Sequence, residues 1–332
     1  MLSLWICFSA ILMRLSSKRC DYTRSVCPVS YIFPVSLMMF SLDLKLRLNE
    51  NHKVMKKIKL LIEYDGTNYH GWQEQKIAIS SLSSASPDKS GQLSALSRKN
   101  ILTIQGILQE KLKTITGEDV KVIGSSRTDA GVHAFGQVAS FLTDSYLEPE
   151  VLQRALNSLL PEDIRILNTE EVNEAFHPRY DAVSKSYFYL ISNMSISSAF
   201  LYRYAWRVPH RLDMDSMKEA GSLLKGRHDF SAFRGAGCGA KTTGRDIISF
   251  NIERLERIDF MTAGLEGDFI KIRIEANAFL RYMVRNIVGT LVEIGRGKMA
   301  AHAISDAFEL KDRRKTGPTA PATGLFLEAI KY

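Results

Sequence analysis

Stretches with the two-residue period of a β-strand alternate with stretches of helical period along this chain, from Ile58 almost to its last residue. Alternating apolar side chains predict strands at 58–64, 120–123, 137–142, 164–166 and 184–191. Apolar positions three and four apart predict helices at 103–117 and 151–161, of which the first has Thr103 as its N-cap and Gly117 as its stop. This order of elements indicates an α/β protein.

The second part of the chain repeats this plan. A helical pattern precedes Gly226, strand patterns cover 247–252 and 269–274, a helix is expected from about Phe279, and a last strand runs through 325–329. Sequence identity between the two parts is not evident, so the repeat rests on the order of elements. The sequence therefore predicts two similar α/β (α+β type) halves, 55–180 and 181–332, with antiparallel or mixed sheets.

Two segments do not follow the plan. Residues 1–54 mix apolar, Ser-rich and basic stretches without a sustained period, which favours a disordered extension or a mis-called start over a targeting segment. Residues 77–100 are rich in Ser, Ala, Lys and Gly, and we expect a solvated loop inserted into the first half. The apolar opening 1–13 is too short to cross a bilayer and has no basic residue before it, which disfavours a signal peptide or membrane anchor.

Charge and cysteine content restrict the function only loosely. Lys and Arg number 44 against 36 Asp and Glu, a net charge of +8 that suits a polyanionic partner and is also common among unrelated proteins. The four cysteines have neither a disulfide framework nor the spacing of zinc ligands. A reducing cytoplasm is the compartment that this cysteine pattern favours.

A polar loop at 124–136 is expected between two strands, and its segment 127–133 combines a guanidinium, a hydroxyl, a carboxylate and an imidazole. Rigid flanks suit a functional loop, and this one can present Asp129 to a ligand. An Arg-x-Asp pair is also a common surface ion pair of little energetic consequence. From the residues alone, the catalytic and the structural interpretations of Asp129 stay equally open.

A series of motifs in this order resembles the tRNA pseudouridine synthase A family, over roughly 55–332. The matching segments are Tyr64-Asp65-Gly66, Gly71-Trp72-Gln73, Arg127-Thr128-Asp129-Ala130-Gly131-Val132-His133-Ala134, Phe176-His177-Pro178-Arg179, Lys185-Ser186-Tyr187-Phe188-Tyr189, Asp229-Phe230-Ser231-Ala232-Phe233-Arg234, Asn277-Ala278-Phe279, Met283-Val284-Arg285-Asn286-Ile287-Val288-Gly289 and Gly324-Leu325. Several long motifs in sequence are far more specific than one short pattern.

The resemblance implies that Asp129 is the catalytic carboxylate of an RNA isomerase. Uridine and pseudouridine contain the same atoms, so the enzyme breaks the N1–C1′ bond, turns the uracil and joins C5 to C1′. A carboxylate can serve as a nucleophile at C1′ or C6, or as a base at C2′, and these routes stay open. No metal and no organic cofactor is implied.

The resemblance also assigns roles to four other residues. Arg285 is expected to pair with Asp129 and keep it ionised, Tyr187 to stack on the target base and assist removal of the C5 proton, Arg127 to hold the extruded nucleotide, and Leu325 to line the base pocket. Without the resemblance, Arg285 is a surface residue of a helix, and Tyr187 and Leu325 are core residues of strands. Tyr189, on the same strand face as Tyr187, is the obvious alternative for its role.

The family further implies the pseudouridine synthase fold, in which the sheets of the two halves join across a central RNA-binding cleft. It implies a cytoplasmic homodimer that modifies uridines 38, 39 and 40 of the tRNA anticodon stem-loop, recognised mainly by shape and backbone. The chain departs from the family at 1–54, at 77–100 and at Lys185-Ser186, where two basic residues often stand. Two rival functions are an RNA-binding module without turnover and an Asp-dependent nucleotide hydrolase that requires a divalent ion.

Overall fold

The computed structural model describes residues 55–74, 102–196, 198–260 and 263–332. The extension 1–54 and the insertion 77–100 that the sequence predicts both lie outside the described residues. All elements below belong to a single compact unit that starts at Val54.

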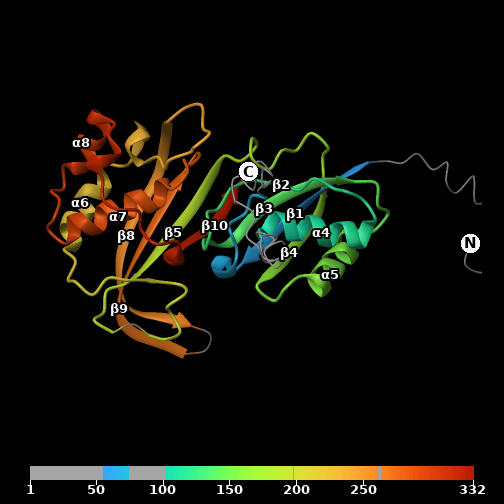
Figure 1. Cartoon of the computed structure of the whole chain (residues 1–332), viewed down its shortest axis with the longest axis horizontal. Helices are drawn as coiled ribbons and strands as arrows, with labels where there is room; N and C mark the ends of the chain where they lie inside the picture. The colour runs from blue at the N-terminus through green and yellow to red at the C-terminus, as the bar shows by residue number, and fades with distance from the viewer. Residues whose placement is uncertain (1–54, 75–101, 197, 261–262) are drawn as a thin grey trace, which may run out of the picture. The chain divides into compact units, whose positions relative to one another are not determined.

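One large sheet runs through this unit (Figure 1). Its strands lie in the order β4 (Ile164–Val172), β1 (Lys56–Tyr64), β3 (His133–Thr143), β10 (Leu325–Lys331), β5 (Ser184–Ser192), β9 (Ala263–Ala276), β8 (Gly244–Phe260) and β7 (Gly226–Asp229). Two short strands lie off this path: β2 (Ile123–Gly124) pairs with β3, and β6 (Trp206–Arg207) pairs with β5. Neighbours are antiparallel except for β10 with β3 and β6 with β5, so the sheet is mixed.

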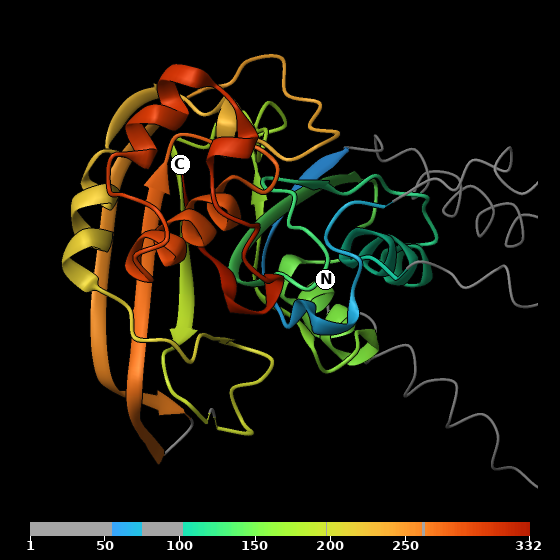
Figure 2. The same cartoon turned by 60° about the vertical axis from the view of Figure 1, so that its left-hand side comes forward.

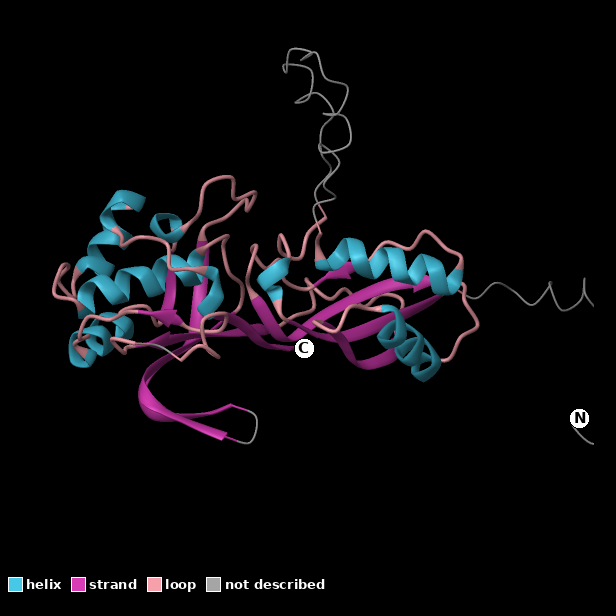
Figure 3. Cartoon of the chain, turned by 60° about the horizontal axis from the view of Figure 1, so that its bottom comes forward, coloured by secondary structure: helices cyan, strands magenta, loops and turns pink. Residues whose placement is uncertain are grey.

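Five α-helices accompany this sheet in the described part of the chain, mainly along one side of it (Figure 3). They are α4 (Ile104–Thr116), α5 (Pro149–Leu159), α6 (Met214–Ser222), α7 (Met283–Gly295) and α8 (Ala303–Leu310). Helix α5 packs on β4 and α4, whereas α6 packs on β8 and α7 (Figure 2). The mixed sheet with its helices confirms the α/β fold class that the sequence predicts. None of the described helices is both long and apolar enough to cross a membrane.

Helix ends and strand faces follow the local sequence. The Thr103 side chain accepts a hydrogen bond from the Gly106 N–H and begins α4, and Gly117 ends this helix in the left-handed conformation, as predicted. In β1, Ile58, Leu60 and Ile62 are fully buried on one face, which is the alternation that the sequence contains.

Other bounds differ from the prediction. Helix α7 begins at Met283 and not near Phe279, because Tyr282 has a φ of 63°, which no helix continues through. The loop predicted at 124–136 is shorter, since Gly124 belongs to β2 and β3 already begins at His133. Strands β8 and β9 are longer than their apolar cores suggested, because polar positions extend their hairpin ladder to Phe260 and Ala263.

The last strand lies in the middle of the sheet. Strand β10 is antiparallel to β5 and parallel to β3, so the C-terminal segment pairs with a strand on either side of residue 180. Parallel pairing of this kind depends on contacts that are distant in sequence. The division into halves at residue 180 stays a prediction, and β10 joins what lies on its two sides into one sheet.

Candidate functional site

The loop between β2 and β3, residues 125–132, is held by hydrogen bonds at several points. The Ser125 N–H donates to the Val138 carbonyl at 2.8 Å, and the Gln137 side-chain amide bonds both the N–H and the carbonyl of Ser126. Further on, the Tyr64 hydroxyl lies 2.8 Å from the Thr128 hydroxyl. The backbone on either side of Asp129 is thereby fixed before any ligand binds.

The backbone at Gly71 and Trp72 lies directly against the loop at Thr128. Gly71 has a φ of 87°, and a Cβ at this position would lie 2.4 Å from the Thr128 carbonyl oxygen. The next residue, Trp72, donates its backbone N–H to the same carbonyl at 3.1 Å. Only glycine combines this φ with so close an approach, which explains why residue 71 is a glycine. Trp72 itself is buried in the core and not available to a base.

Gly71→Ala is expected to lower the free energy of unfolding by about 2–4 kcal/mol, because a left-handed φ and a backbone clash act together. Gly117→Ala is the matched control, since Gly117 has a φ of 75° and an added Cβ would have no described atom within 4 Å. This control should cost only about 1 kcal/mol. Urea titrations of both variants separate the clash from the φ penalty, and equal losses would contradict the contact with Thr128.

Asp129 lies next to Arg285, from a distant part of the chain. The Arg285 Nη1 is 3.6 Å from the Asp129 Oδ2, and the two side chains are only 15% and 19% exposed, respectively. The Arg285 Nε donates to the Ala320 carbonyl at 2.7 Å, and its guanidinium lies 5.0 Å from the centre of the Tyr282 ring. A planar cation held on two sides in this way keeps one orientation toward the carboxylate.

Burial and charge have opposite effects on Asp129. Burial raises the pKa of this carboxyl, and the nearby charges of Arg285 and Arg281 lower it without cancelling the rise. The ionised form of Asp129 is therefore held at a free-energy cost, with Arg285 as its main compensation. A carboxylate in this condition is a stronger base and a better nucleophile than an exposed one.

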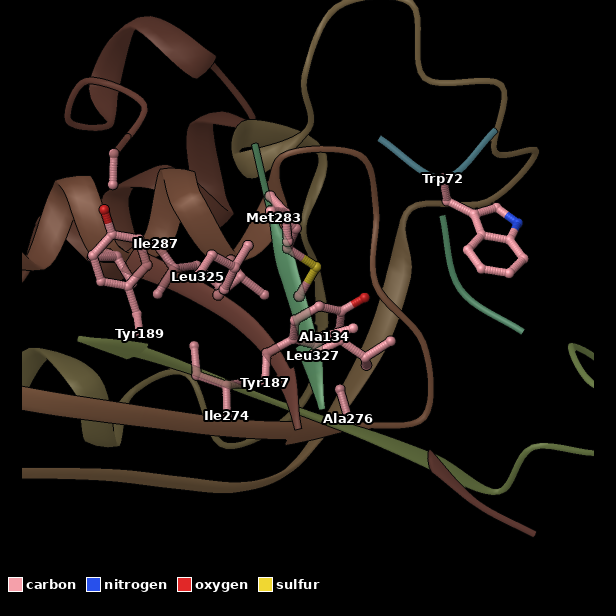
Figure 4. Packing of buried hydrophobic residues seen from close by; sticks show 14 of the residues in the cluster. Trp72, Ala134, Tyr187, Tyr189, Ile274, Ala276, Met283, Ile287, Leu325 and Leu327 are labelled. Carbon is pink, nitrogen blue, oxygen red and sulfur yellow. The ribbon is translucent and has the colours of Figure 1, made fainter. Parts of the chain in front are cut away.

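Tyr187 approaches the same loop from β5. Its hydroxyl lies 2.7 Å from the Ser126 hydroxyl, and its ring packs edge-on against Phe279 with the ring centres 5.0 Å apart. Figure 4 shows Tyr187 beside Met283 of α7. Burial raises the pKa of Tyr187 to about 12, and the charge of Asp129 adds to the rise. Tyr187 therefore keeps its proton at neutral pH.

Tyr189 shares the face of Tyr187 but has a different environment. Its hydroxyl donates to the Pro321 carbonyl at 2.8 Å, and its side chain is fully buried. Leu325, the first residue of β10, pairs with Tyr189 across the ladder and is 5% exposed. Both lie near Ile287 in Figure 4. Of the two tyrosines, only Tyr187 contacts the loop that carries Asp129.

The remaining candidate of the loop, Arg127, is exposed. Its side chain forms no hydrogen bond or ion pair with Asp129 in the described part of the chain. His133 is buried, with its Nδ1 3.1 Å from the Gly66 N–H and its Nε2 3.0 Å from the Arg203 carbonyl, so both ring nitrogens already have partners in the protein. These contacts give His133 a structural role.

Three contributors to the site were not identified from the sequence. They are the Ser126 hydroxyl, the Ala320 carbonyl and the charge of Arg281, which acts on Asp129. Ser126 directly precedes the Arg-Thr-Asp segment, and Arg281 lies four residues before Arg285. Their positions next to these motifs could have identified both as site residues. Nothing in the sequence points to a backbone carbonyl 35 residues away from Arg285.

Comparison with known proteins identifies the family. The model of a family described as tRNA pseudouridine synthase matches residues 89–181 and 220–332. Proteins named tRNA pseudouridine synthase A from Thermodesulfovibrio yellowstonii and Acetivibrio thermocellus are each 43% identical over 278 residues, which cover 84% of this chain and 100% of each relative. The protein of that name from Thermoanaerobacter sp. is 42% identical with the same coverage. By these matches, the chain belongs to the tRNA pseudouridine synthase A family of RNA isomerases.

Proposed function

We propose that this chain isomerises uridine to pseudouridine in the anticodon stem-loop of tRNA, at positions 38, 39 and 40, with Asp129 as its catalytic carboxylate. The observation that carries the proposal is the largely buried pair of Asp129 and Arg285, 3.6 Å apart, with Tyr187 against the same loop. A carboxylate whose pKa is raised by burial beside a specific charged partner is characteristic of active sites.

The reaction needs no net change in atoms. The N1–C1′ bond breaks, the uracil turns, C5 bonds to C1′, and the proton that C5 loses is balanced by one that N1 gains. Asp129 acts either as the nucleophile at C1′ or C6 or as the base that takes the C2′ proton. Arg285 holds it ionised for this step.

The other predicted residues have a place in this scheme, although one of the two roles expected for Tyr187 changes. Tyr187, protonated at neutral pH, stacks on the base and holds it by its hydroxyl, and removal of the C5 proton by a phenolate is disfavoured by its raised pKa. Exposed Arg127 holds the phosphate of the nucleotide once it has left the stack, and Leu325 lines the base pocket. As in the family resemblance, we propose that the enzyme is a cytoplasmic homodimer and uses no cofactor.

Tritium release from tRNA labelled at uridine C5 tests the proposal. Wild type should release tritium, Asp129→Asn should not, and Asp119→Asn should behave as wild type, because Asp119 is an exposed carboxylate paired with Lys113. Transcripts that keep a single uridine at position 38, 39 or 40 then identify the sites. Tight tRNA binding by wild type without release would instead support a binding module, and release that depends on a divalent ion would contradict the scheme.

Tyr187→Phe is expected to lower kcat by about 10²-fold, because the lost hydroxyl no longer orders Ser126 and the base. Tyr189→Phe is the matched control on the same strand face. It loses the bond to Pro321 and should cost about 1 kcal/mol of stability while kcat stays within about threefold of wild type. A larger kcat effect at Tyr189 than at Tyr187 would reverse the assignment of the two tyrosines.

A further inference from the structure

A buried ammonium group lies beside the site without a carboxylate partner. Lys185 is 7% exposed, and its Nζ donates to the Ser125 carbonyl. Within the described residues, that carbonyl is its single hydrogen-bond partner and it takes part in no salt bridge. An ammonium can donate three hydrogen bonds, and its burial is costly unless an anion compensates it. The proposed mechanism leaves this charge without a use.

A second cation lies on the same face of the sheet. In the ladder, Lys185 of β5 is opposite Ala276 of β9, which is opposite Ile247 of β8. Arg245 stands two residues before Ile247 and so faces the same side, with its Cα about 12 Å from that of Lys185, across two strand spacings and two residues along the strand. The Arg245 Nε is buried and has no hydrogen-bond partner among the described residues. The Arg245 Nη1 donates to the Gly244 carbonyl and to the Thr242 hydroxyl.

The charge of a third residue, in the loop before β5, acts on both. Arg179 is exposed, and the residue before it, Pro178, accepts a hydrogen bond from the Tyr332 hydroxyl at 2.8 Å. Burial and, to a smaller extent, repulsion from Arg179 lower the pKa of Lys185 to about 8. Burial and the same repulsion lower the pKa of Arg245. We call Arg179, Lys185 and Arg245 the cationic triad, and none of the three forms a salt bridge in the part of the chain that the structure describes.

The cationic triad is close to the proposed reaction centre. Tyr187 is two residues beyond Lys185 on the same face of β5, about 7 Å along the strand. Ser125, which accepts from Lys185, precedes the hydrogen-bond partner of Tyr187, Ser126, and lies four residues before Asp129. Figure 4 shows Ala276, which is opposite Lys185 in the ladder, close to Tyr187. An anion on the triad would therefore lie beside a nucleotide bound at Asp129.

We propose that the cationic triad binds a backbone phosphate of the RNA next to the nucleotide that reacts at Asp129. The inference rests on the proposed function and adds a site to it. A phosphodiester offers acceptors for the two guanidinium groups at the surface, and Lys185 beneath them supplies charge that no protein carboxylate in the described part of the chain neutralises. The contact carries no sequence information, which suits an enzyme that must accept neighbouring uridines in one pocket.

The salt dependence of tRNA binding tests the site without requiring turnover. The equilibrium constant for tRNA should be measured by fluorescence anisotropy between 50 and 200 mM KCl, for wild type and for the double variant Arg179→Gln/Arg245→Gln. Each phosphate contact that is lost lowers the slope of log K against log salt by about 0.7–0.9. We expect this decrease, together with binding about tenfold weaker at 100 mM KCl.

Matched variants separate the triad from general charge. Arg257→Gln removes an exposed charge from the same strand as Arg245, roughly 40 Å further along, and its slope should equal that of wild type. Lys185→Gln keeps a donor for the Ser125 carbonyl but loses the charge, so it should bind tRNA more weakly than wild type. Lys185→Arg keeps the charge and should bind tRNA as wild type does. A double variant with the wild-type slope, or an Arg257→Gln slope that falls as much, overturns the proposal.

The two proposals fail in different ways. Wild type that releases no tritium, while the double variant still shows the reduced slope, contradicts the proposed function and leaves the phosphate site in place. Wild type that releases tritium, with a double variant whose slope is unchanged, contradicts the phosphate site and leaves the function in place.

Discussion

Asp129→Asn is expected to abolish isomerisation and, at neutral pH, to stabilise the folded chain. The amide keeps the shape of the carboxyl but cannot act as nucleophile or base, so turnover should fall by at least about 10³-fold. The same change removes a charge whose burial outweighs its attraction to Arg285. We expect a gain of about 1 kcal/mol in the free energy of unfolding, as is common when a strained active-site group is relaxed.

The pH dependence of this gain follows from the raised pKa of Asp129. A carboxyl whose pKa is higher in the folded than in the unfolded chain contributes stability below the unfolded pKa and loses it as pH rises through the folded pKa. The Tm difference between Asp129→Asn and wild type should therefore grow from pH 4 to pH 7 and nearly vanish at the acid end. Asp119→Asn, at an exposed acid, should show no such trend. A variant less stable than wild type at pH 7 would contradict this balance of burial and charge.

Arg285→Met should lower kcat/KM by about 10²–10³-fold and shift its acid limb to higher pH. Arg285 supplies the largest charge effect that lowers the pKa of Asp129, so without it the carboxyl takes up a proton at higher pH. If the reaction requires ionised Asp129, activity rises with pH up to a plateau, and the variant reaches that plateau later than wild type. Tritium release measured from pH 5 to pH 9 gives both curves.

Arg285→Lys is the control for charge without geometry. A lysine keeps the positive charge but not the planar group that bonds the Ala320 carbonyl and lies over Tyr282. Its acid limb should lie between those of wild type and Arg285→Met. An acid limb unchanged in Arg285→Met would show that another group controls the ionisation of Asp129. Because the Ala320 contact is lost in both variants, each should also be about 1–2 kcal/mol less stable than wild type.

The predictions for Asp129→Asn and Arg285→Met both follow from the raised pKa of Asp129, which sets stability against reactivity. The protein pays in stability for a reactive carboxylate, and Arg285 limits that cost by an ion pair that is neither fully exposed nor fully buried. In the cationic triad the charge without a partner is positive. There we propose that a phosphate of the RNA substrate neutralises it.

Local features were predictable from the sequence because they depend on near neighbours in the chain. Alternation in β1, the Thr103 cap and the Gly117 stop of α4 follow from side-chain period and capping chemistry, and each was confirmed. The start of α7 was not, because it depends on the left-handed φ of Tyr282, whose ring packs so closely on Gly235 that an added Cβ there would lie 2.3 Å from it. Bounds of this kind depend on packing that no window of sequence contains.

The sequence by itself determined which groups are present for chemistry: the carboxylate of Asp129 in its loop, the guanidinium of Arg285 on a helix and the phenol of Tyr187 on a strand. Only the tertiary structure decided that they meet, because β10 pairs with both β3 and β5 and brings Ala320 and Arg285 toward the loop of Asp129. It also decided the sign of the pKa shift, since burial is a property of the packed fold and not of the residue. The same holds for Lys185 and Arg245, which are far apart in sequence and share a face of the sheet only because of the strand register.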